Sequence, residues 1–453
     1  MRRLMTAALA LVLAGATAAA AADAALVRRG EYLAKAGDCA ACHTAPGGRP
    51  MAGGLLLPTP VGAIAATNIT PSRTHGIGNY TLAQFSAALR KGVRADGANL
   101  YPAMPYTSYA KVTDADVAAM YAYFMQAVPA VDAAPAQRTA LHFPFSIRKS
   151  MVAWNLLFLD SAPFVADPGK SVQWNRGAYL TRGLAHCGAC HTPRNVMMAE
   201  SIRRELGGGD VGGWHAPNIT ADANSGVGGW SEQALVDYMR LGRAAGKAQA
   251  AGPMAEAVDH SLRYLGEKDL RAIAVYLKAV PAVHDASDTR PVNAWGAPHD
   301  ELNSVRGVAW PKDRNQMSGP QLYDAHCATC HQAQGQGSFD GGLPPLFHNT
   351  TLGRSNTNNL VMVLLDGVER QADGRQVLMP GFRKTMSDQQ IATLGGYLAR
   401  SYGNPDAKVT VEQVSTLRSA KAPMTLIWLV QGGMLLVLAL VAGFWLRRRR
   451  KIR

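Results

Sequence analysis

The chain has 453 residues, of which 48% are hydrophobic and 17% charged, and its formal net charge at pH 7 is +14. This length leaves room for about three domains beside any targeting segments. Arg2, Arg3 and the basic residues of 447–453 supply much of the positive charge, so only about +6 remains on the rest of the chain. The charge therefore argues against a nucleic-acid-binding protein, whose basic residues cluster on the folded domain.

The first 24 residues are expected to be a secretory signal peptide. Arg2 and Arg3 precede an apolar run over residues 4–20, and small residues continue to Ala25. This order of a basic, an apolar and a small-residue region is typical of a cleaved export signal. An N-terminal membrane anchor is the alternative, but the apolar run is short. We therefore expect the mature chain to lie in the bacterial periplasm.

Three Cys-x-x-Cys-His motifs account for all six cysteines, at residues 39–43, 187–191 and 327–331. This motif is the attachment signature of c-type haem. On a helix, positions i, i+3 and i+4 share one face, so both thiols and the imidazole can meet one porphyrin. The sequence predicts three covalently bound haem c groups, held by Cys39, Cys42, Cys187, Cys190, Cys327 and Cys330, with His43, His191 and His331 as axial iron ligands.

Zinc sites and redox dithiols also use Cys-x-x-Cys pairs. A zinc site needs further Cys or His ligands nearby, and no cysteine is left over to supply them. A redox dithiol needs no histidine after the second cysteine and no threefold repetition. Disulfides are possible outside the cytoplasm, but a bridge across two intervening residues is strained.

Sequence around the motifs repeats. Arg29-Gly30-Glu31-Tyr32-Leu33 precedes the first motif and Arg176-Gly177-Ala178-Tyr179-Leu180 the second, and Gly319 occupies the equivalent place before the third. Asn-Ile-Thr follows at 68–70 and again at 218–220. Apolar residues recur at helical intervals, and Thr81-x-x-Gln84 and Ser387-x-x-Gln390 have capping-box spacing. Helices are predicted over residues 82–91, 114–125, 231–241, 267–278, 358–365 and 388–400.

These patterns predict an all-α fold of three tandem cytochrome c-like domains followed by one C-terminal transmembrane helix. Pro-rich stretches separate the domains, which we expect at residues 25–145, 146–305 (with a connector) and 306–410. The apolar stretch 151–159 is expected to connect the first two domains. Docking of a partner subunit or a quinone is the alternative role for this stretch.

A methionine beside a proline follows each motif. Met104, Met254 and Met379 are therefore predicted to be the second axial ligands, since proline stiffens the turn that would hold the thioether. Methionine opposite histidine gives a six-coordinate iron with a raised reduction potential. Met120, Met125, Met239 and Met362 lie in helical runs and are expected in the core. Six other histidines remain as less favoured ligands: His75, His186, His215, His260, His326 and His348.

At the C-terminal end, residues 424–446 are almost wholly apolar, which is long enough to cross a bilayer. Residues 447–453 are nearly all basic and are expected to remain cytoplasmic by the positive-inside rule. A buried core helix is the alternative, but such a helix is rarely followed by a block of charge. The sequence thus predicts a single-pass anchor that holds the body on the periplasmic face of the inner membrane.

The chain resembles the triheme cytochrome c subunits of membrane-bound periplasmic dehydrogenases, of the quinoprotein alcohol dehydrogenase type and the flavoprotein gluconate, sorbitol or fructose dehydrogenase type. The resemblance implies the haem ligands named above, a catalytic dehydrogenase subunit as partner, and electron transfer to ubiquinone in the inner membrane. It extends from about residue 25 to 402 and rests on residues 37–44, 67–70, 76–80, 100–106 and 186–195.

Two other functions remain open at this point. One is a freestanding, membrane-anchored carrier between respiratory complexes. The other is a multi-haem enzyme of the peroxidase type, which needs one five-coordinate iron. If all three irons have His and Met ligands, the chain moves electrons and has no catalytic residue of its own.

Overall fold

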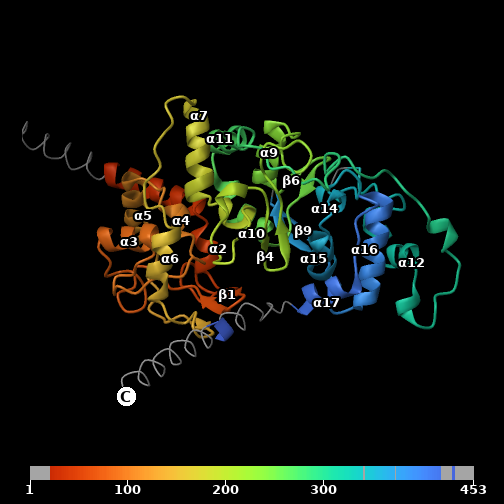
Figure 1. Cartoon of the computed structure of the whole chain (residues 1–453), viewed down its shortest axis with the longest axis horizontal. Helices are drawn as coiled ribbons and strands as arrows, with labels where there is room; N and C mark the ends of the chain where they lie inside the picture. The colour runs from red at the N-terminus through yellow and green to blue at the C-terminus, as the bar shows by residue number, and fades with distance from the viewer. Residues whose placement is uncertain (1–20, 340–341, 373, 420–430, 434–453) are drawn as a thin grey trace, which may run out of the picture.

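The computed structural model describes residues 21–339, 342–372, 374–419 and 431–433. The expected signal peptide falls almost entirely outside these residues, as does the basic tail 447–453. The three expected domains are called the first, second and third segments below. Figure 1 shows them in a row along the long axis of the molecule, from red through green to blue.

The first segment begins with a helix over residues 21–36, which ends shortly before the first motif. The predicted helix after residue 81 is confirmed, since Thr81 and Gln84 form a capping box at its start, and Phe85 and Leu89 are buried. The other elements follow in chain order: α2 (Cys39–His43), β1 (Leu56–Thr59), β2 (Gly62–Ala65), α3 (Leu82–Lys91), α4 (Tyr106–Tyr109), α5 (Asp114–Gln126) and β3 (Ala140–Leu141).

The second segment repeats this order of helices after a connecting helix. Its elements are α6 (Ser150–Phe158), α7 (Val172–Tyr179), η1 (Leu180–Leu184), α8 (Gly188–His191), η2 (Ile202–Arg204), β4 (Gly209–Val211), β5 (Trp214–Ala216), α9 (Glu232–Leu241), β6 (Arg243–Ala244), β7 (Ala248–Gln249), α10 (Gly252–His260), η3 (Leu262–Tyr264) and α11 (Glu267–Leu277).

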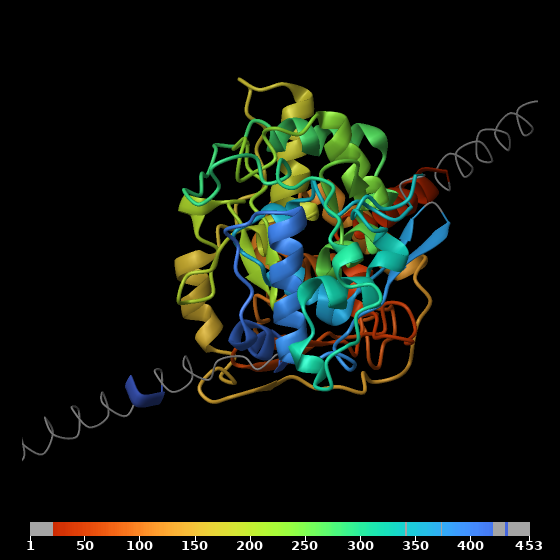
Figure 2. The same ribbon diagram turned by 90° about the vertical axis from the view of Figure 1, so that its right-hand side faces the viewer.

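The third segment is preceded by η4 (Leu302–Ser304). Figure 2 looks onto this segment, with the blue helix α16 at its centre. Its elements are η5 (Arg314–Gln316), α12 (Gly319–His326), α13 (Ala328–His331), α14 (Thr350–Gly353), α15 (Asn358–Asp366), β8 (Val368–Ala372), β9 (Arg375–Met379) and α16 (Asp388–Tyr402). Helix α17 (Val411–Ser419) follows directly after the segment.

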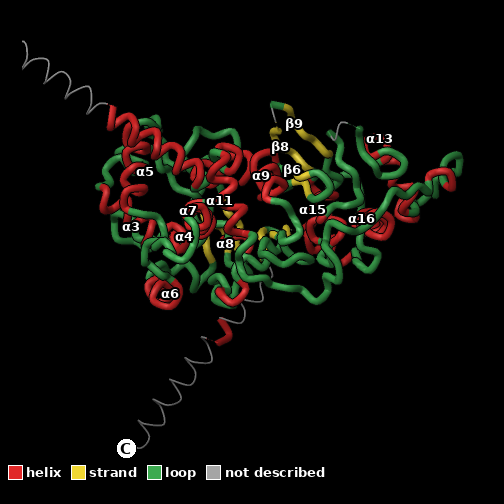
Figure 3. Tube along the Cα trace, turned by 90° about the horizontal axis from the view of Figure 1, so that it is seen from above, coloured by secondary structure: helices red, strands yellow, loops and turns green. Residues whose placement is uncertain are grey.

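The prediction of an all-α fold is wrong. The described residues include nine short strands, which form one three-stranded and three two-stranded antiparallel sheets. Figure 3 shows them as short yellow pieces among the helices and loops. The longest pair, β8 and β9, joins five residues on each side, from Val368 opposite Met379 to Ala372 opposite Arg375. Strands of two to five residues are too short for the two-residue alternation that identifies a strand in sequence.

The predicted C-terminal transmembrane helix is also not supported. In the parts of the chain that the structure describes, every helix is too short or too polar to span a bilayer. Of the expected span 424–446, only residues 431–433 lie in those parts.

Each segment is built around one close helix crossing at a glycine. A Cβ on Gly30 would lie 1.9 Å from the carbonyl oxygen of Ala119 in α5. A Cβ on Gly177 in α7 would lie 2.0 Å from the carbonyl oxygen of Ala272 in α11. Gly319 in α12 has the same role against α16, where a Cβ would approach the Cβ of Tyr397 to 2.4 Å. The repeated glycine before each motif therefore lets the first and last helices of the segment touch.

The buried core is continuous across the first two segments and separate in the third. The first core contains side chains from Leu33 to Val280, and the second from Leu302 to Val414. The third segment still packs against the second: Asn359 in α15 accepts a hydrogen bond from the backbone N–H of His215 and donates one to its carbonyl oxygen, both at 2.8 Å.

Helix α6 packs against both of the segments that it connects. The Trp154 ring is 6% exposed and lies 6.4 Å from the ring of Tyr106 in the first segment. Its Nε1 donates a hydrogen bond of 2.9 Å to the carbonyl oxygen of Met197 in the second. Leu156 and Leu157 on the same helix are 83% and 70% exposed. The stretch is thus a structural connector that also presents apolar side chains to solvent.

Candidate haem sites

Each Cys-x-x-Cys-His motif forms one turn of helix. In α2 both cysteines are inside the helix, whereas α8 and α13 begin directly after the first cysteine. None of the six cysteines is joined to another in a disulfide. Burial raises the pKa of the Cys39, Cys187 and Cys327 thiols to about 12 in each case. No three His, Cys, Asp or Glu side chains converge as a metal site within the described ranges.

The three motif histidines have the same orientation. The distance from Nδ1 to a backbone carbonyl oxygen is 2.6 Å for His43 and Thr67, 2.6 Å for His191 and Pro217, and 3.2 Å for His331 and Pro344. This contact places the proton on Nδ1 and leaves Nε2 as the electron-pair donor that binds a metal.

Burial also keeps these imidazoles neutral. It lowers the pKa of His43 and His331, and it lowers the pKa of His191 to about 4. In each case the hydrogen bond to the carbonyl opposes the shift but does not cancel it. The neutral ring is the form that ligates iron, so the three histidines fit an axial role.

The repeated Asn-Ile-Thr sequence fixes the carbonyl groups that two of these histidines contact. Asn68 directly follows Thr67, and its side chain donates 2.8 Å to the carbonyl oxygen of Val131 while accepting from the N–H of Thr70 at 2.9 Å. Asn218 directly follows Pro217 and makes the equivalent contacts with Val283 and Thr220. Sequence reasoning recognised the repeat but missed this role, which its place just after Thr67 and Pro217 could have indicated.

The three methionines predicted as ligands all pack against a core. Met104 and Met254 lie against the core of the first two segments and Met379 against that of the third. Their local structures differ. Met104 lies in a turn before α4, Met254 in the first turn of α10, and Met379 at the end of β9. The expected common turn is therefore present only at Met104.

Three of the six other histidines, His186, His215 and His326, have local side-chain contacts. The His186 ring lies 5.6 Å from the ring of Tyr109, and His326 lies 5.7 Å from that of Phe382. The distance from His215 Nδ1 to Asp210 Oδ1 is 2.9 Å. These contacts favour local structural roles over iron ligation.

One buried polar atom in the second segment fits a haem carboxylate. Trp230 is 6% exposed, and its Nε1 has no hydrogen-bond partner among the described residues. It lies just before α9, which carries the buried side chains Leu235, Val236 and Met239. An indole N–H buried without an acceptor is costly, and a porphyrin propionate is an acceptor of suitable chemistry.

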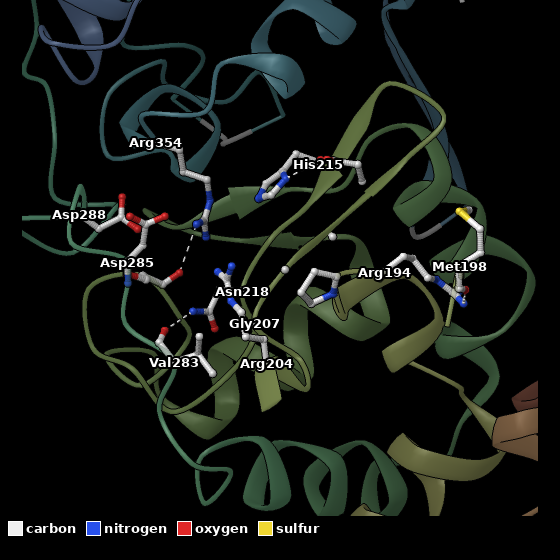
Figure 4. Close-up of a pocket in the computed structure, with 15 residues that line it drawn as sticks. Arg194, Met198, Arg204, Gly207, His215, Asn218, Val283, Asp285, Asp288 and Arg354 are labelled. Atoms are coloured by element: carbon white, nitrogen blue, oxygen red, sulfur yellow. Dashed lines mark hydrogen bonds and ion pairs between the residues drawn. The ribbon is translucent and has the colours of Figure 1, made fainter. Parts of the chain in front are cut away.

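A cavity of about 380 Å³ adjoins the second motif. Figure 4 shows the Arg354 guanidinium from the third segment turned into the same space as Asn218 and His215. Arg354 is 8% exposed and donates 3.1 Å to the carbonyl oxygen of Ser225. Burial lowers the pKa of Arg354, although the carboxylate of Asp288 opposes this shift. The wall of the cavity is thus completed by a buried cation that sequence reasoning did not identify.

Comparison with known proteins decides the family. A sequence profile of the cytochrome c family matches residues 27–127 and 316–401. The cytochrome subunit of fructose dehydrogenase from Gluconobacter japonicus is 45% identical over 447 residues, which cover 94% of this chain and 91% of that protein. The chain belongs to the cytochrome c subunits of dehydrogenases.

Two further relatives of this cytochrome subunit serve other dehydrogenases. The cytochrome c subunit of gluconate 2-dehydrogenase from Pantoea cypripedii is 39% identical, with 92% of this chain and 95% of that protein covered. The cytochrome c subunit of quinone alcohol dehydrogenase from Gluconacetobacter polyoxogenes is 38% identical, with 89% and 86% covered. The chain is therefore an electron-transfer cytochrome with covalent haem c, and it is not itself the catalytic subunit of a dehydrogenase.

Proposed function

We propose that the chain carries three covalent haem c groups and passes electrons from a catalytic dehydrogenase subunit to ubiquinone. The observation that carries this proposal is the threefold recurrence of a motif helix whose histidine turns Nε2 away from its backbone partner. Haem iron, when bound, supplies one-electron redox chemistry. We propose that each of the three segments, 25–145, 146–305 and 306–410, is one such unit.

The side chains of this chain would hold the irons and keep substrates away from them. Cys39, Cys42, Cys187, Cys190, Cys327 and Cys330 would attach the porphyrins, and His43, His191, His331, Met104, Met254 and Met379 would ligate the irons. With a histidine and a methionine each, the irons would have no free coordination position and would exchange electrons without reacting with a substrate.

The relatives support the proposed partner, and the expected signal peptide supports the proposed compartment. Relatives named for fructose, gluconate and alcohol oxidation favour a sugar, sugar-acid or alcohol dehydrogenase as the catalytic subunit. We place the protein in the periplasm, where haem c is attached in bacteria. Ubiquinone in the inner membrane is the proposed electron acceptor.

Replacing Met254 with alanine is expected to lower the reduction potential of one haem and to produce a high-spin ferric signal. Methionine opposite histidine raises the potential and completes a six-coordinate iron, so its loss removes both effects. Potentiometry with visible spectroscopy measures the change.

The control for this variant is Met239→Leu, a conservative change of a buried methionine in α9. This change should leave the haem spectra as they are. If the alanine variants of Met104, Met254 and Met379 all kept the parental spectra and potentials, the ligand assignment would be wrong. A high-spin iron in the unaltered protein would instead favour the enzyme alternative.

The overall function is tested on the protein isolated from membranes with its partner. Fructose, gluconate, sorbitol, ethanol and an aldehyde are added in turn, and haem reduction is followed by absorbance. One substrate should reduce the haems rapidly, and a ubiquinone analogue should reoxidise them. If dithionite reduces the haems but no substrate does in a preparation that retains a cofactor-bearing subunit, the freestanding carrier becomes the better interpretation.

A further inference from the structure

Two tyrosines cross between the first and second segments in a reciprocal arrangement. Tyr32 of the first segment donates a hydrogen bond of 2.6 Å to Asp269 in α11 of the second. Tyr179 of the second segment donates one of 2.6 Å to Asp116 in α5 of the first. Each tyrosine thus reaches the last helix of the other segment.

The two aspartates are held from their own segments by equivalent arginines. Arg29 Nε donates 2.8 Å to Asp116, and Arg176 Nε donates 2.8 Å to Asp269. The N-cap residues of α5 and α11, Thr113 and Gly266, add one more contact each. The N–H of Thr113 lies 3.4 Å from the Tyr179 hydroxyl, and that of Gly266 lies 3.1 Å from the Tyr32 hydroxyl.

In the repeated Arg-Gly-x-Tyr sequence, the arginine, the glycine and the tyrosine therefore each make a different contact. The arginine binds an aspartate of its own segment, the glycine allows the helix crossing, and the tyrosine binds the aspartate of the other segment. Asp116 is 1% exposed and Tyr179 is 6% exposed, so the interface around this pair is closed to water. Asp116 accepts hydrogen bonds from Arg29 of the first segment and from Tyr179 of the second. Because this carboxylate is buried, its hydrogen bonds resist movement of one segment relative to the other.

This interface also brings the first two motifs together. The Tyr109 hydroxyl donates 2.6 Å to the carbonyl oxygen of Gly37, two residues before Cys39. The ring of Tyr109 lies 5.6 Å from that of His186, which directly precedes Cys187. One tyrosine therefore bridges the residues that lead into both motif helices.

A second contact joins the same two regions. The Ser261 hydroxyl, just after α10, donates 3.2 Å to the carbonyl oxygen of Ala36. Helix α10 contacts α2, and Figure 1 shows the two helices next to each other. The first motif therefore lies against the helix that carries Met254.

We propose that Tyr32 and Tyr179 are positioning residues that fix the first and second haem sites relative to each other for electron exchange. The proposal rests on the haem attachment proposed above. The exchange moves one electron within the chain, so no bond is made and no proton is transferred. Its rate depends steeply on the separation of the two sites, and the two Tyr–Asp bonds help to hold that separation.

The test is the double variant Y32F/Y179F in the full-length, haem-loaded protein. The substitutions remove both crossing hydrogen bonds and keep the aromatic rings. Flash photoreduction followed by time-resolved absorbance should show a several-fold slower equilibration between the first two haems, with the individual midpoint potentials retained. A merely structural role would alter haem content or potentials together with the rate.

The matched control is Tyr121→Phe, which removes a 2.7 Å hydrogen bond to the carbonyl oxygen of Tyr80 within the first segment. It should leave the exchange rate as in the parent. If the double variant fails to fold, the single variants Y32F and Y179F are measured in its place.

An unchanged exchange rate in the fully haem-loaded double variant, or in both single variants if the double variant does not fold, would overturn the proposal. Counting the haems on the unaltered protein distinguishes a failure of the proposed function from a failure of the positioning role. If the first two motifs do not each carry a haem, the proposed function fails, whereas slow or fast exchange between two attached haems concerns the positioning role alone.

Discussion

Replacing Cys187 and Cys190 together with alanine is expected to reduce the covalent haem content from the proposed three groups to two. The thioether bonds have no substitute in the second segment, because every cysteine of the chain belongs to one of the three motifs. The loss should also interrupt electron flow from the catalytic subunit to the quinone, since the second segment contacts both of the others.

Mass spectrometry of the denatured protein and haem staining after denaturing electrophoresis measure the attached groups. The matched control is Ala189→Ser, which alters the same turn of helix between the two cysteines and keeps both thiols. It should retain all three haems. A double variant with undiminished covalent haem would contradict the assignment of these thiols.

Replacing Gly177 with alanine is expected to destabilise the second segment by about 1–3 kcal/mol, the usual cost of overpacking a close contact. The added Cβ would lie 2.0 Å from the carbonyl oxygen of Ala272, and backbone cannot move aside as a flexible side chain would. The helices α7 and α11 must therefore separate, which disturbs the interface with the first segment.

The midpoint of denaturant unfolding, followed by haem absorbance in the Soret region, measures this loss. Gly183→Ala is the matched control, because a Cβ there would meet its nearest atom at an ordinary distance of 3.6 Å. The control should unfold near the parental midpoint. Equal midpoints for both variants would mean that the crossing tolerates a wider separation than the structure indicates.

Sequence patterns located the helices well because the capping residues that begin a helix lie next to it in the chain. The helix predicted over residues 82–91 has those bounds, and the capping boxes at Thr81 and Ser387 are both formed. The short strands were missed because runs of two to five residues are too short to show the two-residue alternation that identifies a strand. The hairpin of β8 and β9 places Met379 at a strand end, where a turn had been expected.

The proposed haem-binding residues were predicted from sequence, whereas their supporting contacts could not be predicted. The spacing of Cys187, Cys190 and His191 is a local signature of attachment. The contact between Asn218 and Val283, by contrast, joins residues 65 positions apart. Arg354 reaches the cavity beside the second motif from a different segment, and no pattern around residue 354 indicates that destination.

The reciprocal Tyr–Asp interface is isologous, the geometry found between two subunits of a twofold-symmetric homodimer. Fusion of two copies of one ancestral haem domain would produce it, since each half supplies the same donor and the same acceptor. The third segment has Ser318 and Gln321 at the positions of the arginine and the tyrosine, and these residues cap the start of α12. A chimaera in which the first segment replaces the second would thus keep both crossing bonds, whereas one built with the third segment would lose them.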